Sequence, residues 1–134
     1  DLATHSYSSY ANRVNHGAIR VQGGYSGTLG VGRKFTFKYD ATSWKAFHGV
    51  LVVAATGGHS RFSFGGYWNN SGSCQIKEIQ NGISTSAAFT TSGQAILISI
   101  TLGQTVVHPC FSLEYNQSGG DGPPRMDRAE VFIQ

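Results

Sequence analysis

Apolar and polar residues alternate with a period of two in several short stretches, and this pattern constrains the fold more than any other feature of the chain. In RKFTFKYD, from Arg33 to Asp40, three aromatic residues fall on one face, while Lys34, Thr36 and Lys38 fall on the other. Successive side chains of a β-strand point to opposite faces, so this stretch is predicted to be a half-buried strand. No window of eleven residues sustains the spacing of an amphipathic helix.

Other stretches also have the character of strands. GQAILISITLG alternates, and its core face is predicted to hold Ile96, Ile98, Ile100 and Leu102. The continuous apolar run AFHGVLVVAA, residues 46–55, predicts a strand buried on both faces. Further strands are predicted in SRFSFGGYW, VVHPCFSLEY, GAIRVQGG, SCQIKEIQ and the closing segment AEVFIQ.

Glycine-rich turn signals separate these stretches at short intervals. The strongest is Asn81-Gly82, which predicts a hairpin between CQIKEIQ and ISTSAAF. Short strands broken by such turns predict an all-β fold, an antiparallel β-sandwich of jelly-roll type. The length of 134 residues predicts a single domain over 1–134, in which residues 1–16 form either an N-terminal arm or a short strand.

The charge content is low, and the basic residues are scattered. Charged residues make up 13% of the chain, about half of the usual share, and the net charge is +3. Nucleic-acid binding requires a clustered basic face, so no nucleic-acid partner is expected. No run of eighteen apolar residues predicts a membrane span. The polar but uncharged composition suits an extracellular or virion setting, and a start at Asp1 without Met indicates a processed product or a piece of a longer chain.

Signatures of catalysis or metal binding are missing from the sequence. The five histidines fall in none of the local arrangements typical of a metal site, so no metal and no cofactor are expected. There is no G-x-S-x-G elbow and no phosphate-binding loop, which predicts a protein that is not an enzyme. A pair of glycosidase carboxylates brought together by the fold remains an open alternative. Cys74 and Cys110 are either bridged in an oxidising compartment or free as small hydrophobes.

Aromatic and hydrogen-bonding residues crowd together in GGHSRFSFGGYWNNSGS. Sugar rings stack on exposed aromatic side chains, while amide, imidazole and guanidinium groups bind hydroxyls. The stretch is therefore predicted to bind a glycan through His59, Arg61, Tyr67, Trp68, Asn69 and Asn70. The alternative, that Tyr67 and Trp68 end a core strand, stays open because one of two adjacent side chains points inward.

A second candidate site is the loop QSGGDGPPR, which precedes the closing segment. Its glycines permit unusual backbone conformations, and its two prolines stiffen the exit. The loop is predicted to be either a clasp facing a symmetry axis or an exposed recognition loop, with Ser118, Asp121 and Arg125 as its candidate residues.

From about Arg33 onward the chain resembles the distal C-terminal receptor-binding head domains of virus and bacteriophage tail fibres. The resemblance is carried by Ser43-Trp44-Lys45, Gly65-Gly66-Tyr67, His108-Pro109 and QSGGDGPPR before a terminal strand. It implies a β-sandwich head on an upstream shaft, a homotrimer and a location at the fibre tip of a virion. It also implies attachment to a host cell-surface glycan or receptor, without membrane insertion.

The function most consistent with these features is a non-enzymatic, glycan-binding head of a viral or phage fibre. One alternative is a purely structural module that caps a fibre or virion. Another is a secreted lectin of the tumour-necrosis-factor or complement-head type, and a glycan hydrolase is the least favoured. A fold-level analogy alone does not choose among them.

Overall fold

A computed structural model describes residues 5–12, 18–40, 45–68, 72–92, 95–119 and 126–134 of the chain. All of its regular elements are strands, and the described part contains no helix long and apolar enough to cross a membrane. The strands are β1 (His5–Asn12), β2 (Ala18–Gly24), β3 (Thr28–Leu29), β4 (Lys34–Asp40), β5 (Lys45–Ala55), β6 (Gly58–Trp68), β7 (Gly72–Asn81), β8 (Thr85–Ser92), β9 (Ala95–Leu102), β10 (Val106–Val107), β11 (Cys110–Gly119) and β12 (Met126–Ile133).

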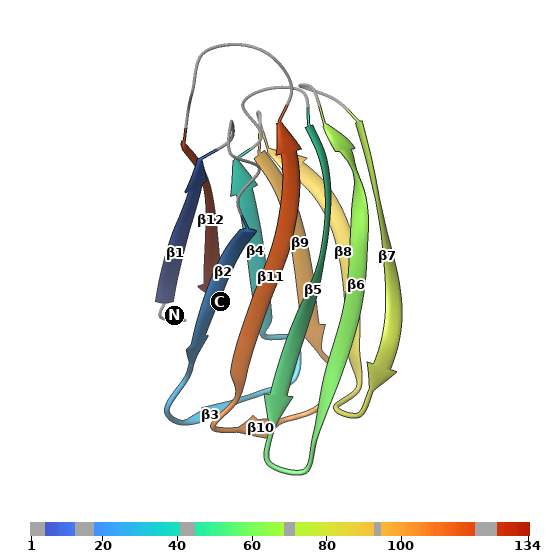
Figure 1. Cartoon of the computed structure of the whole chain (residues 1–134). Helices are drawn as coiled ribbons and strands as arrows, with labels where there is room; N and C mark the ends of the chain where they lie inside the picture. The colour runs from blue at the N-terminus through green and yellow to red at the C-terminus, as the bar shows by residue number, and fades with distance from the viewer. Residues whose placement is uncertain (1–4, 13–17, 41–44, 69–71, 93–94, 120–125) are drawn as a thin grey trace.

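Two five-stranded antiparallel sheets pack face to face (Figure 1). Sheet A has the order β1-β12-β4-β9-β8, and sheet B has the order β2-β11-β5-β6-β7. The short strands β3 and β10 pair with each other at one end of the sandwich. The predicted all-β antiparallel sandwich is therefore confirmed.

The strand order is that of a jelly roll with one insertion. Without β7 and β8, the sheets read β1-β12-β4-β9 and β2-β11-β5-β6, and the chain crosses between them in the manner of two interlocked Greek keys. β7 extends sheet B beyond β6, and β8 extends sheet A beyond β9, so the insertion widens both sheets on the same side (Figure 1).

The core forms where the apolar faces of the alternating strands meet. Phe35, Phe37 and Tyr39 of β4 are all buried, as the alternation predicted. Aromatic rings join the two sheets: the ring centroids of Tyr39 and Tyr115 lie 4.6 Å apart, and those of Phe35 and Phe111 lie 6.0 Å apart. Such aromatic pairs add about 0.5–1.5 kcal/mol each to the contribution from area burial.

The prediction that residues 46–55 are buried on both faces is wrong for the outer face. Leu51 and Val53 of β5 are fully buried against sheet A, but Val50 and Val52, which point outward, are only half-buried. Nothing packs on the outside of sheet B within the described chain, so these valines are covered only by side chains of the neighbouring strands. They form an apolar strip along β5 on the outer face of sheet B.

The predicted hairpin at Asn81-Gly82 is also wrong, because β7 pairs with β6 and β8 pairs with β9. The turn instead carries the chain from sheet B to sheet A. Asn81 holds it in place: its Oδ1 accepts hydrogen bonds from the Thr85 backbone N at 2.7 Å and from Ser60 Oγ at 3.0 Å. Asn81 and Gly82 do form a turn, but the residues of a turn do not decide which strands become neighbours.

The two ends of the chain lie side by side in sheet A. β1 pairs with β12 along its whole length, with His5 opposite Ile133 and Asn12 opposite Met126. The predicted closing strand is therefore present, and the buried side chains of Val131 and Ile133 attach it to the core. The two cysteines are free thiols, so they are not bridged.

Candidate functional site

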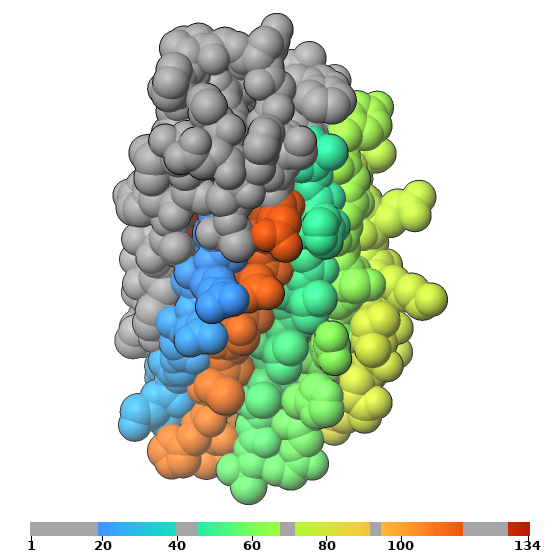
Figure 2. Space-filling model, in the orientation of Figure 1, coloured from blue at the N-terminus to red at the C-terminus, as the bar shows by residue number. Residues whose placement is uncertain are grey.

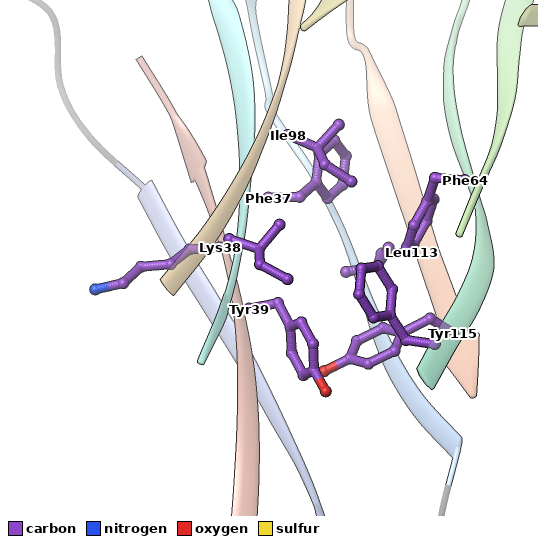
Figure 3. A pocket seen from close by; sticks show the side chains of 9 residues that line it. Phe37, Lys38, Tyr39, Phe64, Ile98, Leu113 and Tyr115 are labelled. Carbon is purple, nitrogen blue, oxygen red and sulfur yellow. The ribbon is translucent and has the colours of Figure 1, made fainter. Parts of the chain in front are cut away.

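An apolar space between the two sheets is too small to hold a ligand. It encloses about 10 Å³, roughly the volume that one water molecule needs. In Figure 3 the rings of Tyr39 and Tyr115 meet at its edge, and the Lys38 side chain points away from the other labelled residues. This space is a packing gap in the core, so binding must be sought on the surface.

The outer face of sheet B carries a hollow of about 410 Å³, which is in the size range of small-molecule sites. Figure 2 looks onto this face, with β2, β11, β5, β6 and β7 crossing the view in sheet order. The hollow runs along β5, and it is lined by Val50, Val52, His59, Arg61, Ser112 and Glu114.

Strand register explains why these residues gather. Val52 of β5 lies opposite Arg61 of β6 on one side and opposite Ser112 of β11 on the other. The half-buried valines thus make an apolar floor, and polar side chains of β6 and β11 make the two walls. These two strands are separated by two interstrand spacings, roughly 9–10 Å, which accommodates a sugar ring lying flat on the floor.

The charges around the hollow are not balanced. Glu114 forms an ion pair with Arg20 of β2, through the Arg20 Nε and Glu114 Oε2 atoms. Arg61 is exposed and forms no ion pair with any side chain in the described chain. One wall is therefore internally neutralised, and the other presents an unpaired guanidinium.

A second hollow, of about 330 Å³, lies on the same face between β6 and β7. Ser63 and Gly65 of β6 line it together with Gln75 and Lys77 of β7. Ser63 lies directly opposite Lys77, and Gly65 lies opposite Gln75. Because Ser63 and Arg61 are successive outward positions on β6, the two hollows adjoin.

The first candidate stretch is only partly assembled into one site. His59 and Arg61 line the first hollow. Tyr67 is 51% exposed and belongs to the same outward series of β6, but it lies six positions from Arg61, roughly 20 Å along a strand. Trp68 ends β6 with its backbone opposite Lys45 and Gly72, and its side chain lies outside the described part. Asn69 and Asn70 also lie outside the described residues.

Only one residue of the second candidate loop belongs to the described part. Ser118 lies in β11, where it is opposite Ala46 of β5, so its backbone belongs to a strand and not to a loop. Asp121 and Arg125 lie outside the described residues. The roles of this segment as a clasp or a recognition loop stay predictions.

Sequence reasoning missed the floor and the far wall of the hollow. The sequence predicted Val50 and Val52 to be buried, and it predicted the strand that carries Ser112 and Glu114 without assigning either residue to a site. The alternation of β11 does indicate that Ser112 and Glu114 face outward. The local sequence does not show, however, that β11 pairs with β5. Among the described residues, no group of three His, Cys, Asp or Glu is placed to hold a metal ion.

No protein-family model matches the chain, and no curated protein matches it. Among solved structures, it is similar to the tailspike protein gp49 from Acinetobacter baumannii bacteriophage Fri1, a capsular polysaccharide depolymerase. The identity is 10% and the TM-score is 0.52, over 89% of this chain and 21% of the tailspike. The Acinetobacter baumannii phage AM24 tailspike gives a TM-score of 0.41 at 9% identity, over 90% of this chain and 27% of that one.

The similarity to the Fri1 tailspike is a likeness of fold, and the chain spans about a fifth of the length of that protein. The Fri1 protein is a bacteriophage tailspike, so this likeness of fold is compatible with the resemblance to phage tail proteins stated above.

Proposed function

We propose that this domain is a non-enzymatic, glycan-binding head of a phage tail fibre or tailspike, which is displayed as a homotrimer at the fibre tip of the virion. The observation that carries the proposal is the hollow on the outer face of sheet B. Its apolar floor, Val50 and Val52, suits the C–H face of a sugar ring, and its polar walls suit the ring hydroxyls. The fold likeness to a phage tailspike supports the setting.

An open, shallow site of this kind is expected to bind a sugar weakly in each single head. A shallow contact with one or two sugars gives a dissociation constant of about 1 mM, which corresponds to about 4 kcal/mol. A trimer that engages a repetitive polysaccharide at several sites gains orders of magnitude through effective concentration. The homotrimer rests on the resemblance to fibre heads, and light scattering of the purified domain tests it directly.

A blocking substitution tests the location of the site. Ser112 lies in the wall of the hollow opposite Val52, so the indole of Ser112→Trp would cover the apolar floor and narrow the hollow. Ala88→Trp on the exposed outer face of β8 in sheet A adds the same ring at a distance and serves as the control. We expect Ser112→Trp to lose binding on an array of bacterial surface polysaccharides, while Ala88→Trp binds as the wild type does.

Two results would count against the proposal. One is a wild-type trimer that binds no polysaccharide on the array. The other is a folded Ser112→Trp variant that binds as well as the wild type, which would move recognition away from the hollow. Melting temperature and light scattering for each variant ensure that a loss of binding is not a loss of fold or assembly.

Cleavage of the glycan is the second candidate function, because the Fri1 tailspike is a capsular polysaccharide depolymerase. Three carboxylates have side chains that the structure describes, and their placement does not favour cleavage. Glu114 faces outward from sheet B, Glu130 belongs to sheet A, and Glu78 lines a separate hollow between β7 and β8. No two of these three flank one bond in the manner of a glycosidase pair. Mass spectrometry of a bound polysaccharide after prolonged incubation tests this alternative, since new reducing ends would establish cleavage.

A further inference from the structure

We infer that the glycan held on sheet B is acidic and that Arg61 binds a carboxylate of one of its sugars. This inference rests on the proposed function and specifies the chemical class of the ligand. A hollow built for a neutral sugar needs hydrogen-bonding groups only. This hollow also carries a cation whose charge is not compensated by any described side chain.

The two outward arginines of this face differ in a way that identifies the ligand-binding one. Arg20 is paired with Glu114, so its charge is already satisfied. Glu114 lies opposite Val50, whereas Arg61 lies opposite Val52, which places Arg61 and Glu114 on diagonal positions across β5. By strand geometry, their Cα atoms are roughly 12 Å apart. The carboxylate across the hollow is therefore held by its own partner, and Arg61 faces the space where a sugar would lie.

Lys77 extends the same electrostatic pattern into the second hollow. It lies opposite Ser63, so it is a diagonal neighbour of Arg61, with a separation of about 7–8 Å. Lys77 is exposed and, like Arg61, forms no ion pair in the part of the chain that the structure describes. Two unpaired cations at adjoining hollows suit an acidic oligosaccharide that crosses β6 from one hollow to the other.

The chemistry of the two cations assigns them different tasks. The planar guanidinium of Arg61 can bind both oxygens of a carboxylate at once, which gives direction as well as affinity. The ammonium of Lys77 is a mobile point charge, and it attracts an anion without fixing its orientation. His59, on the same wall as Arg61, is placed to bind a hydroxyl of the same sugar.

The test uses an array of purified bacterial capsular and O-antigen polysaccharides, some acidic and some neutral in composition. Each polysaccharide that the wild-type trimer binds is also presented after carboxyl reduction, which converts each uronic acid into the corresponding neutral sugar. We expect the bound polysaccharides to carry carboxylates and to lose at least about tenfold in affinity on reduction, because charge-assisted hydrogen bonds are lost. Binding should also weaken as salt is raised from 0.05 to about 0.5 M, since the charges are exposed.

Variants connect that loss to the named residue. Arg61→Gln should lower the affinity for the native polysaccharide by about tenfold or more, and Arg61→Lys should recover only part of it. Neither Arg61 variant should differ from the wild type in its affinity for the carboxyl-reduced polysaccharide. Lys34→Gln removes the same unit of charge from an exposed side chain of β4 in sheet A, and it should bind as the wild type does.

The outcomes separate this inference from the proposed function. If the wild type binds neutral or carboxyl-reduced polysaccharides as tightly as the acidic ones, the glycan site stands and its acidic specificity is refuted. Equal loss in Arg61→Gln and Lys34→Gln would likewise refute the role of Arg61, since the effect would then follow net charge alone. If no polysaccharide is bound at all, the proposed function fails, and the inference fails with it.

Discussion

Replacing Gly49 with alanine should destabilise the protein more than its size suggests. Gly49 lies in β5, the central strand of sheet B, where it is buried against the core. A Cβ atom built at this position would lie 2.4 Å from the Glu114 carbonyl oxygen, 2.4 Å from Tyr115 Cβ and 2.7 Å from the ring of Phe64. Real Cβ contacts are about 1 Å longer than the first two of these distances, so the neighbours have to move.

The neighbours cannot easily move. The Glu114 carbonyl and Tyr115 Cβ belong to β11, which is paired with β5 on one side and with β2 on the other. Overpacking in a well-formed core costs about 1–3 kcal/mol, and a clash with backbone belongs at the upper end. A loss of about 3 kcal/mol is a large part of the roughly 5–15 kcal/mol that stabilises a domain. It should lower the melting temperature by about 10 °C.

Gly30 supplies a matched control for the same substitution. A Cβ atom at Gly30 would meet nothing within 4 Å, and its backbone does not have a positive φ. Gly30→Ala should therefore be neutral, or stabilising by about 0.4–1 kcal/mol, because alanine restricts the unfolded chain. Urea denaturation followed by circular dichroism measures both variants. A Gly49→Ala protein within about 0.5 kcal/mol of the wild type would refute the packing of β5 against β11 and Phe64.

Two other regions give sharp expectations. His108 has a φ of 50°, its Nδ1 accepts a hydrogen bond from the Gly27 backbone N at 3.1 Å, and its own N donates to the Gly27 carbonyl at 2.8 Å. In urea denaturation, His108→Ala should lower the free energy of unfolding by about 1–2 kcal/mol. His108→Asn should lower it by less than about 0.5 kcal/mol, because asparagine tolerates a positive φ. Equal losses in the two variants would contradict this account. Burial raises the pKa of the Cys74 thiol to about 11. At pH 8, iodoacetamide should therefore modify the exposed Cys110 much faster than Cys74 in the native protein. Equal rates of modification would show that Cys74 is not shielded. The pKa of this thiol is lower in the unfolded chain than in the folded one, so the folded protein loses stability as the pH rises from about 9 toward 11. Unfolding measurements over this alkaline range should show a smaller loss in Cys74→Ser than in the wild type.

The inward or outward direction of most strand side chains could be predicted from the sequence alone. Ile96, Ile98, Ile100 and Leu102 are buried as their alternation predicted. The direction of a side chain in a strand depends on its position along that strand, so the period of two is local information. The same reasoning predicted the closing strand and the outward placement of exposed charges.

The pairing of strands was decided only by the tertiary structure. The sequence around Asn81 and Gly82 specifies a tight reversal of the chain, but a reversal can close a hairpin or change sheets with equal ease. Which of the two occurs depends on whether β6 or β8 offers the better partner for β7, and that is settled by contacts between residues that are distant in sequence. The residues of the turn therefore predicted its position correctly, but they predicted that β7 and β8 would pair with each other, which is wrong.

The candidate site shows the same division. The aromatic and polar stretch identified His59 and Arg61, because residue types that bind glycans are visible in the sequence. The sequence alone did not predict the floor and the far wall of the hollow, because Val52 and Ser112 meet Arg61 only through the register of β11, β5 and β6. Strand order and register join segments that lie far apart in the chain, and a one-residue change in register would turn each of these side chains to the other face. The alternation in the sequence predicted which side chains of the half-buried strands face outward, and only the folded sheet determined which of them share a surface.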